Sequence, residues 1–245
     1  MRRLLVCLVL ASCQAWATGW TLVGTPAEGT EFSGAYDASL SSSTFNAVSG
    51  NCLFAWSAFG YFGQTARATR ANGQVLTALT IYGTSNQGAG EWFYLCGISA
   101  YPNDAVTISW YHTYPAAWSA QWPRIAVFQY TPPTGTTVAL HQDVGSGGSY
   151  LSGSITSPSF SPDAGDLILH GVSWWPGTLT FGAGVTEVLN SNTTNNAAAA
   201  NLSATAGATT LGASWTGGYG YVFDAVATFT ATASASYVAK RQELP

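Results

Sequence analysis

The stretch Val106-Thr107-Ile108-Ser109-Trp110 alternates large apolar side chains with small polar ones. Successive side chains of a strand point to opposite faces, so this pattern predicts a β-strand with one buried face. Residues 221–231 repeat the pattern, with Tyr221, Phe223 and Phe229 on the same face. Both stretches favour a β-fold over a helical one.

Three other stretches are apolar at almost every position, over residues 52–59, 125–130 and 166–174. Strands of this composition are usually covered on both faces. Weaker strand patterns occur at residues 75–81, 138–142, 186–189 and 209–215. Clusters of Gly, Pro, Ser and Asn separate the segments, and the alanine run 197–200 is expected to be a loop or a single turn. The chain therefore predicts an all-β fold, an antiparallel jelly-roll-like β-sandwich.

The first residues have the features of an export signal. Arg2 and Arg3 precede an apolar run over residues 4–11 that is too short to cross a bilayer. Ala15-Trp16-Ala17 then offers a cleavage site, which makes residues 1–17 a signal peptide. In the alternative, Leu10-Ala11-Ser12-Cys13 is a lipobox and Cys13 carries a lipid anchor. The protein is thus expected to be extracellular or attached to the cell envelope.

The rest of the chain is expected to form a single domain. No linker, composition shift or internal repeat is found in residues 18–233, which we assign to the sandwich. Residues 234–245 are expected to be a flexible tail. The sequence contains no second long apolar stretch, so we expect no transmembrane span.

Composition restricts the possible partners. Charged residues make up only 7% of the chain, and the formal net charge is −4. So few cations cannot form the basic surface that a phosphate backbone requires, and nucleic acid is not an expected partner. The 10 Trp, 12 Tyr and 11 Phe supply enough apolar area for a packed core. The polar surface must come from Ser, Thr, Asn, Gln and Gly, a composition typical of secreted β-proteins.

Two of the four cysteines, Cys7 and Cys13, belong to the export segment, and Cys52 and Cys96 lie in strand-like runs. In an oxidising compartment the latter pair is expected to form a disulfide that closes a loop of about 45 residues. Two free buried thiols are the alternative. No Cys or His spacing suggests a zinc site, and neither a metal nor a cofactor is expected.

Several segments together resemble a bacterial extracellular module. They are Gly50-Asn51-Cys52, Ala164-Gly165-Asp166-Leu167, Gly182-Ala183-Gly184-Val185 and Ala225-Val226-Ala227. The resemblance covers residues 45–231 and implies a sandwich akin to concanavalin-like jelly-roll domains, without a catalytic motif. The aromatic segment 111–123 departs from the pattern, so the resemblance implies no particular partner.

That aromatic segment is the best candidate for a ligand-binding site. It places Tyr114, Trp118 and Trp122 in an uncharged, proline-flanked loop, with Gln121 and His112 beside them. Aromatic faces stack on sugar rings, and nearby amides bond to hydroxyls, so neutral polysaccharide is the expected ligand. In the alternative, these rings cover one end of the core.

A Ser-His-Asp hydrolase would need one of His112, His141 or His170 beside a serine and an acid. Asp166, four residues before His170 on the same strand, would lie about 13 Å from it, too far for contact. No G-x-S-x-G motif is present.

Paired carboxylates could form a glycosidase site, and Glu91, Glu187 and Asp224 are the candidates. We expect these acids to be solvated instead, at strand edges or in turns. Asp163 and Asp166 are expected to form a turn rather than a calcium site.

The sequence thus predicts an exported, non-catalytic binding or structural module, whose partners are polysaccharide or other surface proteins. An extracellular hydrolase of glycan or ester is one alternative. A self-associating surface subunit is the other.

Overall fold

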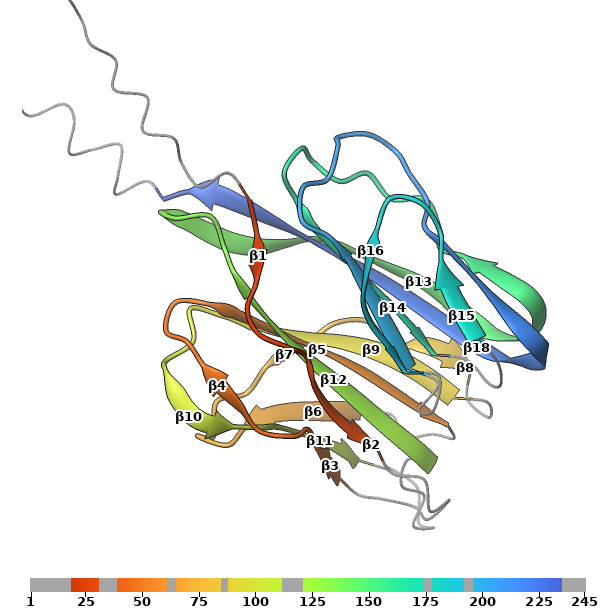
Figure 1. Ribbon diagram of the computed structural model, residues 1–245, viewed down its shortest axis with the longest axis horizontal. Helices are drawn as coiled ribbons and strands as arrows, with labels where there is room; N and C mark the ends of the chain where they lie inside the picture. Colours follow the sequence, from red (N-terminus) through yellow and green to blue (C-terminus); the bar gives the residue numbers. More distant parts are fainter. Residues whose placement is uncertain are drawn as a thin grey trace, which may run out of the picture.

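The computed structural model describes residues 19–30, 39–60, 65–84, 88–111, 121–173, 178–191 and 196–234. Regular structure in these ranges consists of β-strands in antiparallel sheets that stack face to face (Figure 1). The all-β sandwich predicted from the sequence is confirmed. Within the same ranges, no helix is long and apolar enough to cross a membrane.

The first half of the molecule, residues 19–131, contains one large sheet and two small ones. The large sheet has the order β1 (Thr21–Leu22), β12 (Gln121–Thr131), β5 (Cys52–Gly60), β9 (Gly88–Cys96) and β7 (Thr77–Ala78), with β2 (Ala27–Thr30) beside β12 and β8 (Tyr82–Thr84) beside β9. The small sheets are β3 (Ser39–Ser41) with β11 (Val106–Tyr111) and β6 (Thr65–Arg70), and β10 (Tyr101–Asp104) with β4 (Phe45–Ala47).

The second half, residues 136–234, is built around another large sheet. Its order is β13 (Thr136–Thr156), β18 (Gly212–Ala233), β14 (Leu167–Ser173), β17 (Asn196–Asn201) and β16 (Thr186–Ser191). The long strands β13 and β18 also continue into an outer layer, where the start of β18 pairs with β15 (Thr178–Phe181) on one side and with the end of β13 on the other.

The two halves follow the same pairing scheme, a repeat that the sequence analysis does not find. In the first half β5 lies between β12 and β9, and in the second β14 lies between β18 and β17. The three-stranded sheet β3–β11–β6 corresponds to the outer layer that the end of β13, the start of β18 and β15 form. Strands that are separate in the first half are therefore continuous in the second.

The turns that start β5 and β14 repeat the scheme in detail. Gly50 and Gly165 both have a left-handed backbone, with φ of 83° and 88°, which glycine adopts without strain. The Gly50 N–H donates to the carbonyl of Ile98, and the Gly165 N–H donates to that of Ala204, both at 2.9 Å. The repeat is not recognisable in the sequence around these glycines. It is visible in their equivalent backbone hydrogen bonds.

The two large sheets face each other across an interface core. Alternate residues of β5, β9 and β12 point into it, and they meet small and apolar residues of β14, β17 and β18. The Trp92 indole spans the interface, because its Nε1 donates to the carbonyl of Ala225 at 3.0 Å. Figure 1 shows this arrangement, with the first half (red to green) below the second (green to blue).

The opposite faces of both large sheets are also buried. In the first half, Leu53, Phe93 and Val127 pack against Ile108 and Trp110 of the small sheet. In the second half, two smaller clusters cover Val172 and Ile168. Burial on both faces explains why β5, β14 and residues 125–130 of β12 are apolar at almost every position, as predicted.

The predicted disulfide is confirmed. Cys52 and Cys96 lie opposite each other on β5 and β9 and are bonded across a sequence separation of 44. A disulfide is compatible with an extracellular protein. The alternative of two free thiols is wrong.

The expectation of a loop or turn at residues 197–200 is wrong. These alanines belong to β17, which pairs with β14 on one side and β16 on the other. Ala198 and Ala200 point into the interface core, which also contains Trp56 and Trp92. Their burial in this core outweighs the weak strand preference of alanine.

Candidate binding site

The interface between the halves has two long edges, and one of them is closed. There β8 of the first half lies beside β13 of the second. The Tyr82 hydroxyl donates to the carbonyl of Asp143 at 2.9 Å, and the Thr80 N–H donates to the Asp143 carboxylate at 2.7 Å. A Cβ on Gly145 would lie 2.5 Å from the Tyr82 ring, so only glycine permits this close approach.

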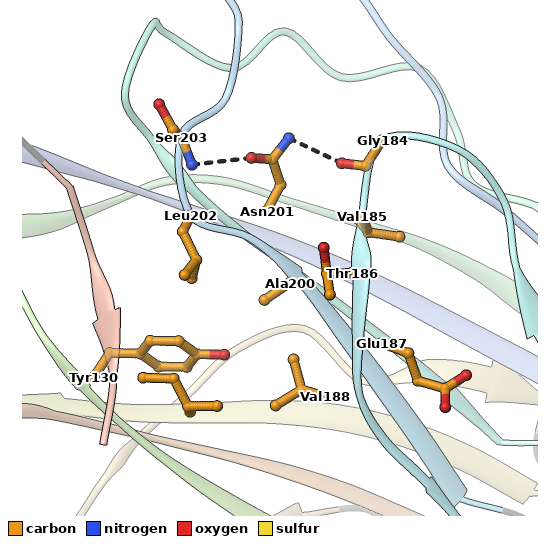
Figure 2. Close-up of a pocket in the computed structure, with 11 residues that line it drawn as sticks. Tyr130, Gly184, Val185, Thr186, Glu187, Val188, Ala200, Asn201, Leu202 and Ser203 are labelled. Atoms are coloured by element: carbon orange, nitrogen blue, oxygen red, sulfur yellow. Dashed lines mark hydrogen bonds between the residues drawn. The ribbon is translucent and has the colours of Figure 1, made fainter. Parts of the chain in front are cut away.

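The other edge, between β1 and β12 on one side and β16 and β17 on the other, is open as a cleft of about 690 Å³ (Figure 2). This volume is within the usual range of ligand sites, which often lie between domains. The lining residues come from both halves: Leu22, Tyr130, Gly184, Val185, Thr186, Glu187, Val188, Ala200, Asn201, Leu202 and Ser203.

Leu22 and Tyr130 are the first-half residues that line the cleft, and Tyr130 comes from β12. Its ring packs edge-on against Phe54, with centroids 5.8 Å apart, and its hydroxyl points toward Val188 and Ala200 in Figure 2. The hydroxyl is buried and has no hydrogen-bond partner. Burial raises the pKa of Tyr130 above its ordinary value, so the hydroxyl remains a protonated donor at physiological pH.

The second half supplies an ordered, polar rim. The Asn201 side-chain amide donates to the carbonyl of Gly184 at 2.9 Å and accepts from the Ser203 N–H at 2.9 Å. The Glu187 carboxylate accepts from the Asn190 amide at 2.9 Å. Glu187 is the single charged residue among those that line the cleft. The cleft thus combines an apolar floor with a rim of amide, hydroxyl and carboxylate groups.

Compared with protein-family models, curated proteins and solved structures, the chain has no match. Its function must therefore be argued from its own geometry.

The aromatic site predicted from the sequence lies outside the described residues. His112, Tyr114 and Trp118 are beyond them, and for Gln121 and Trp122 the structure describes only the backbone, at the start of β12. Their role in binding stays a prediction.

Both histidines in the described ranges contact an aspartate, but neither forms a Ser-His-Asp site. His141 Nδ1 lies 2.7 Å from Asp166, and His170 Nε2 lies 3.3 Å from Asp224. The Ser146 hydroxyl donates to Asp224 at 2.6 Å rather than to His170. A nucleophilic serine needs an imidazole as its base, whereas Ser146 is bonded to the aspartate. Ser146, Asp224 and His170 therefore form a structural hydrogen-bond network.

The three candidate acids do not come together. Glu91 faces the core of the first half opposite Ser57, Asp224 faces the outer layer of the second half, and Glu187 lines the cleft. The expectation that they are solvated holds for Glu187 but is wrong for Glu91 and Asp224, which are 2% and 0% exposed. When both faces of a strand are covered, an acid on either face is buried. The sequence around Glu91 and Asp224 does not show that the second face of their strands is covered.

Asp163 and Asp166 form the predicted turn. The Asp166 N–H donates to the carbonyl of Asp163, and the Asp163 N–H donates to the Asp166 carboxylate at 3.0 Å. Asp166 thereby fixes the start of β14 and also contacts His141.

Proposed function

We propose that this protein is an exported, non-enzymatic binding module that holds a neutral carbohydrate in the cleft between its two halves. The observation that carries the proposal is the asymmetry of the interface. One edge is closed by Tyr82 and Asp143, whereas the other is open as a cleft that residues of both halves line.

The lining of the cleft favours a neutral, hydroxyl-rich ligand. Amide and hydroxyl groups of Asn201, Thr186 and Ser203 lie at its rim, and a single carboxylate gives no strong charge to attract a cation. The apolar floor suits the faces of a sugar ring that carry its C–H groups. Export of the module is supported by the basic and apolar first residues, and the disulfide is compatible with it.

The hydrolase alternative receives little support. It predicts an acid pair or a His/Ser constellation in a groove, and among the described residues the candidate acids lie in three separate places. The carboxyl with the most strongly raised pKa, Glu91, points into the first-half core rather than the cleft.

Self-association is also less favoured. Its best surface would be β13, a 21-residue edge strand. Three register shifts interrupt that strand, and Asp143 within it is already engaged by β8 and the segment before it. Bulges of this kind oppose edge-to-edge pairing.

Binding can be measured by affinity electrophoresis in gels that contain xylan, glucomannan or mixed-linkage glucan. Leu202→Arg places a charge in the cleft and is expected to lower affinity at least about ten-fold. The matched control is Val75→Arg, because Val75 is similarly exposed but does not line the cleft. Trp118→Ala and Trp122→Ala test the aromatic loop independently. If Leu202→Arg retains full binding and the loop variants lose it, the ligand binds to the aromatic loop and not in the cleft.

A further inference from the structure

A second pocket, of about 400 Å³, lies between β12, the connection from β1 to β2 and the segment around β4. The connection bulges out of the sheet at this point. Leu22 pairs with Tyr130 and Ala27 pairs with Val127, so the four residues 23–26 lie opposite only two residues of β12. A bulge bends its strand away from the regular ladder, which leaves space beside β12.

Gln129 is the most buried polar side chain of this pocket, since the residue is 6% exposed. Its Oε1 accepts from the Val48 N–H at 3.0 Å, and because a main-chain N–H can only donate, this bond fixes the orientation of the amide. Nε2 donates to no acceptor among the described residues. Unlike the enclosed Tyr130 hydroxyl, it retains access to the pocket. Water can occupy this position in the free protein, and a ligand oxygen can replace it.

The lining of the pocket restricts the ligand. No charged residue lines it, so an ion would lose its hydration without a partner of opposite charge. The main-chain N–H groups of Val23, Ser43 and Val48 are already bonded, and Pro26 has none, so an extended peptide would find few main-chain partners. Uncharged polar side chains beside apolar ones suit a single neutral sugar unit. These polar side chains are Thr25, Ser43, Thr44, Asn46 and Gln129.

The pocket and the cleft lie on opposite faces of the same sheet edge. Leu22 and Tyr130 line the cleft, whereas their neighbours Val23 and Gln129 line the pocket. Successive side chains of a strand point to opposite faces, and one sheet layer is about 10 Å thick. In the described part of the chain, β1 is at the end of the sheet order, and Figure 1 shows it at the border of the first half. A ligand chain can therefore pass around β1 from one opening to the other.

We propose that this pocket is a second subsite for the polysaccharide chain that the cleft binds. The chain lies in the cleft, turns around the edge at β1 and places one sugar unit in the pocket, where a hydroxyl accepts from Gln129 Nε2. This inference rests on the proposed function and adds that the protein binds oligosaccharides rather than single sugars. Since both subsites hold the same chain, one polypeptide binds one oligosaccharide.

The experiment is isothermal titration calorimetry with a disaccharide and a hexasaccharide from each of the three polysaccharides used in the gels. All of these probes are neutral, so charge does not differ between them. The wild-type protein is expected to bind the hexasaccharide at least about ten-fold more tightly than the disaccharide, because contact with the second subsite is intramolecular once the first is occupied.

Val48→Arg obstructs the pocket from an exposed position, so the fold is retained. This variant is expected to lose about ten-fold in affinity for the hexasaccharide. Val75→Arg is the matched control, because Val75 is similarly exposed and lines neither opening. A second variant, Gln129→Met, removes the amide donors at nearly constant side-chain length and should also weaken hexasaccharide binding, with its urea midpoint as the check on folding.

The failure of the inference can be distinguished from that of the proposed function. If Val48→Arg binds the hexasaccharide as tightly as the wild type does, the pocket is not a subsite, and the carbohydrate module remains intact. Two hexasaccharides bound to each wild-type polypeptide would likewise overturn the shared chain. Binding of no probe, together with no retardation in the polysaccharide gels, overturns both.

Discussion

At the scale of single residues, the first half contains a carboxylic acid inside an apolar core. Burial raises the pKa of Glu91 to about 8, and the charge of Asp143 adds to the effect. The folded protein thus holds the Glu91 proton at pH values where the unfolded chain, with a pKa of about 4.3, has lost it. Its contribution to stability is fully present below about pH 4 and is lost as the pH rises to about 8, by about 3–5 kcal/mol in total.

Glu91→Gln replaces the neutral acid with a neutral amide of the same shape and should remove this pH dependence. In urea titrations we expect wild type and variant to differ little at pH 5, and the variant to be more stable at pH 8. Glu187→Gln is the matched control, because it makes the same change at an exposed glutamate outside the first-half core. Parallel pH profiles for wild type and Glu91→Gln would contradict the prediction.

The interface core also requires a glycine at position 171, where the Trp56 ring packs against the backbone. A Cβ on Gly171 would lie 2.4 Å from the Trp56 ring, far inside van der Waals contact. Gly171→Ala is therefore expected to lower the free energy of unfolding by about 1–3 kcal/mol.

Gly19→Ala is the control for this substitution, because a Cβ there meets open space. Adding Trp56→Phe to Gly171→Ala should destabilise less than the sum of the two single changes, since the smaller ring relieves the overlap. Strict additivity in a chemical denaturation series would show that the two residues do not compete for the same space.

At the scale of strands, the disulfide joins the two neighbours β5 and β9 at the point where β9 ends. Closing a loop of 44 residues restricts the unfolded chain, which in the chain-entropy model stabilises the fold by about 4 kcal/mol. The double variant Cys52→Ala/Cys96→Ala is expected to lose most of this, as measured by its urea midpoint. Wild-type protein in a reducing buffer should show a similar loss, and an unchanged midpoint in both cases would refute the estimate.

How far the strands could be predicted depends on what each one packs against. Residues 52–59, 125–130 and 166–174 are recognisable because burial on two faces requires an apolar residue at nearly every position. The alanines of β17 carry no such pattern, since the core in which they are buried is completed by residues more than 100 positions away in the sequence.

The cleft could not be predicted for a related reason. Its floor and rim combine Leu22, Tyr130 and the segments 184–188 and 200–203, and their proximity depends on sheet order and on how the two sheets face each other. Strand pairing between distant segments is not encoded in local periodicity. Tyr130 looks from the sequence like any other core aromatic, and only the structure reveals that its hydroxyl lacks a partner.

At the scale of the whole molecule, a cluster of aromatic rings lies between the halves rather than within either of them. Phe229 of β18 packs on Phe54 with ring centroids 4.6 Å apart and on Tyr94 at 5.0 Å. Neither half can bury these rings alone. The two halves should therefore unfold as one cooperative unit.

Phe229→Ala is expected to lower the stability of both halves together, by about 3–5 kcal/mol. Hydrogen exchange can measure this, with amides of β5 and β14 reporting on the two halves. Equal loss of protection in both strands supports one unit. Selective loss in β14 would show that the halves unfold independently.

The repeated pairing scheme has a consequence for the number of ligands. If two identical units faced each other about a two-fold axis, both edges of their interface would carry the same residues, and both would be sealed or both open. A single chain that contains both units is free of that constraint, because mutations in one copy leave the other unchanged. Here one edge holds Tyr82 against Asp143 while the other leaves Tyr130 unpaired. If the cleft binds carbohydrate as proposed, the interface has one such position for each polypeptide, and calorimetric titration should give a stoichiometry of about one.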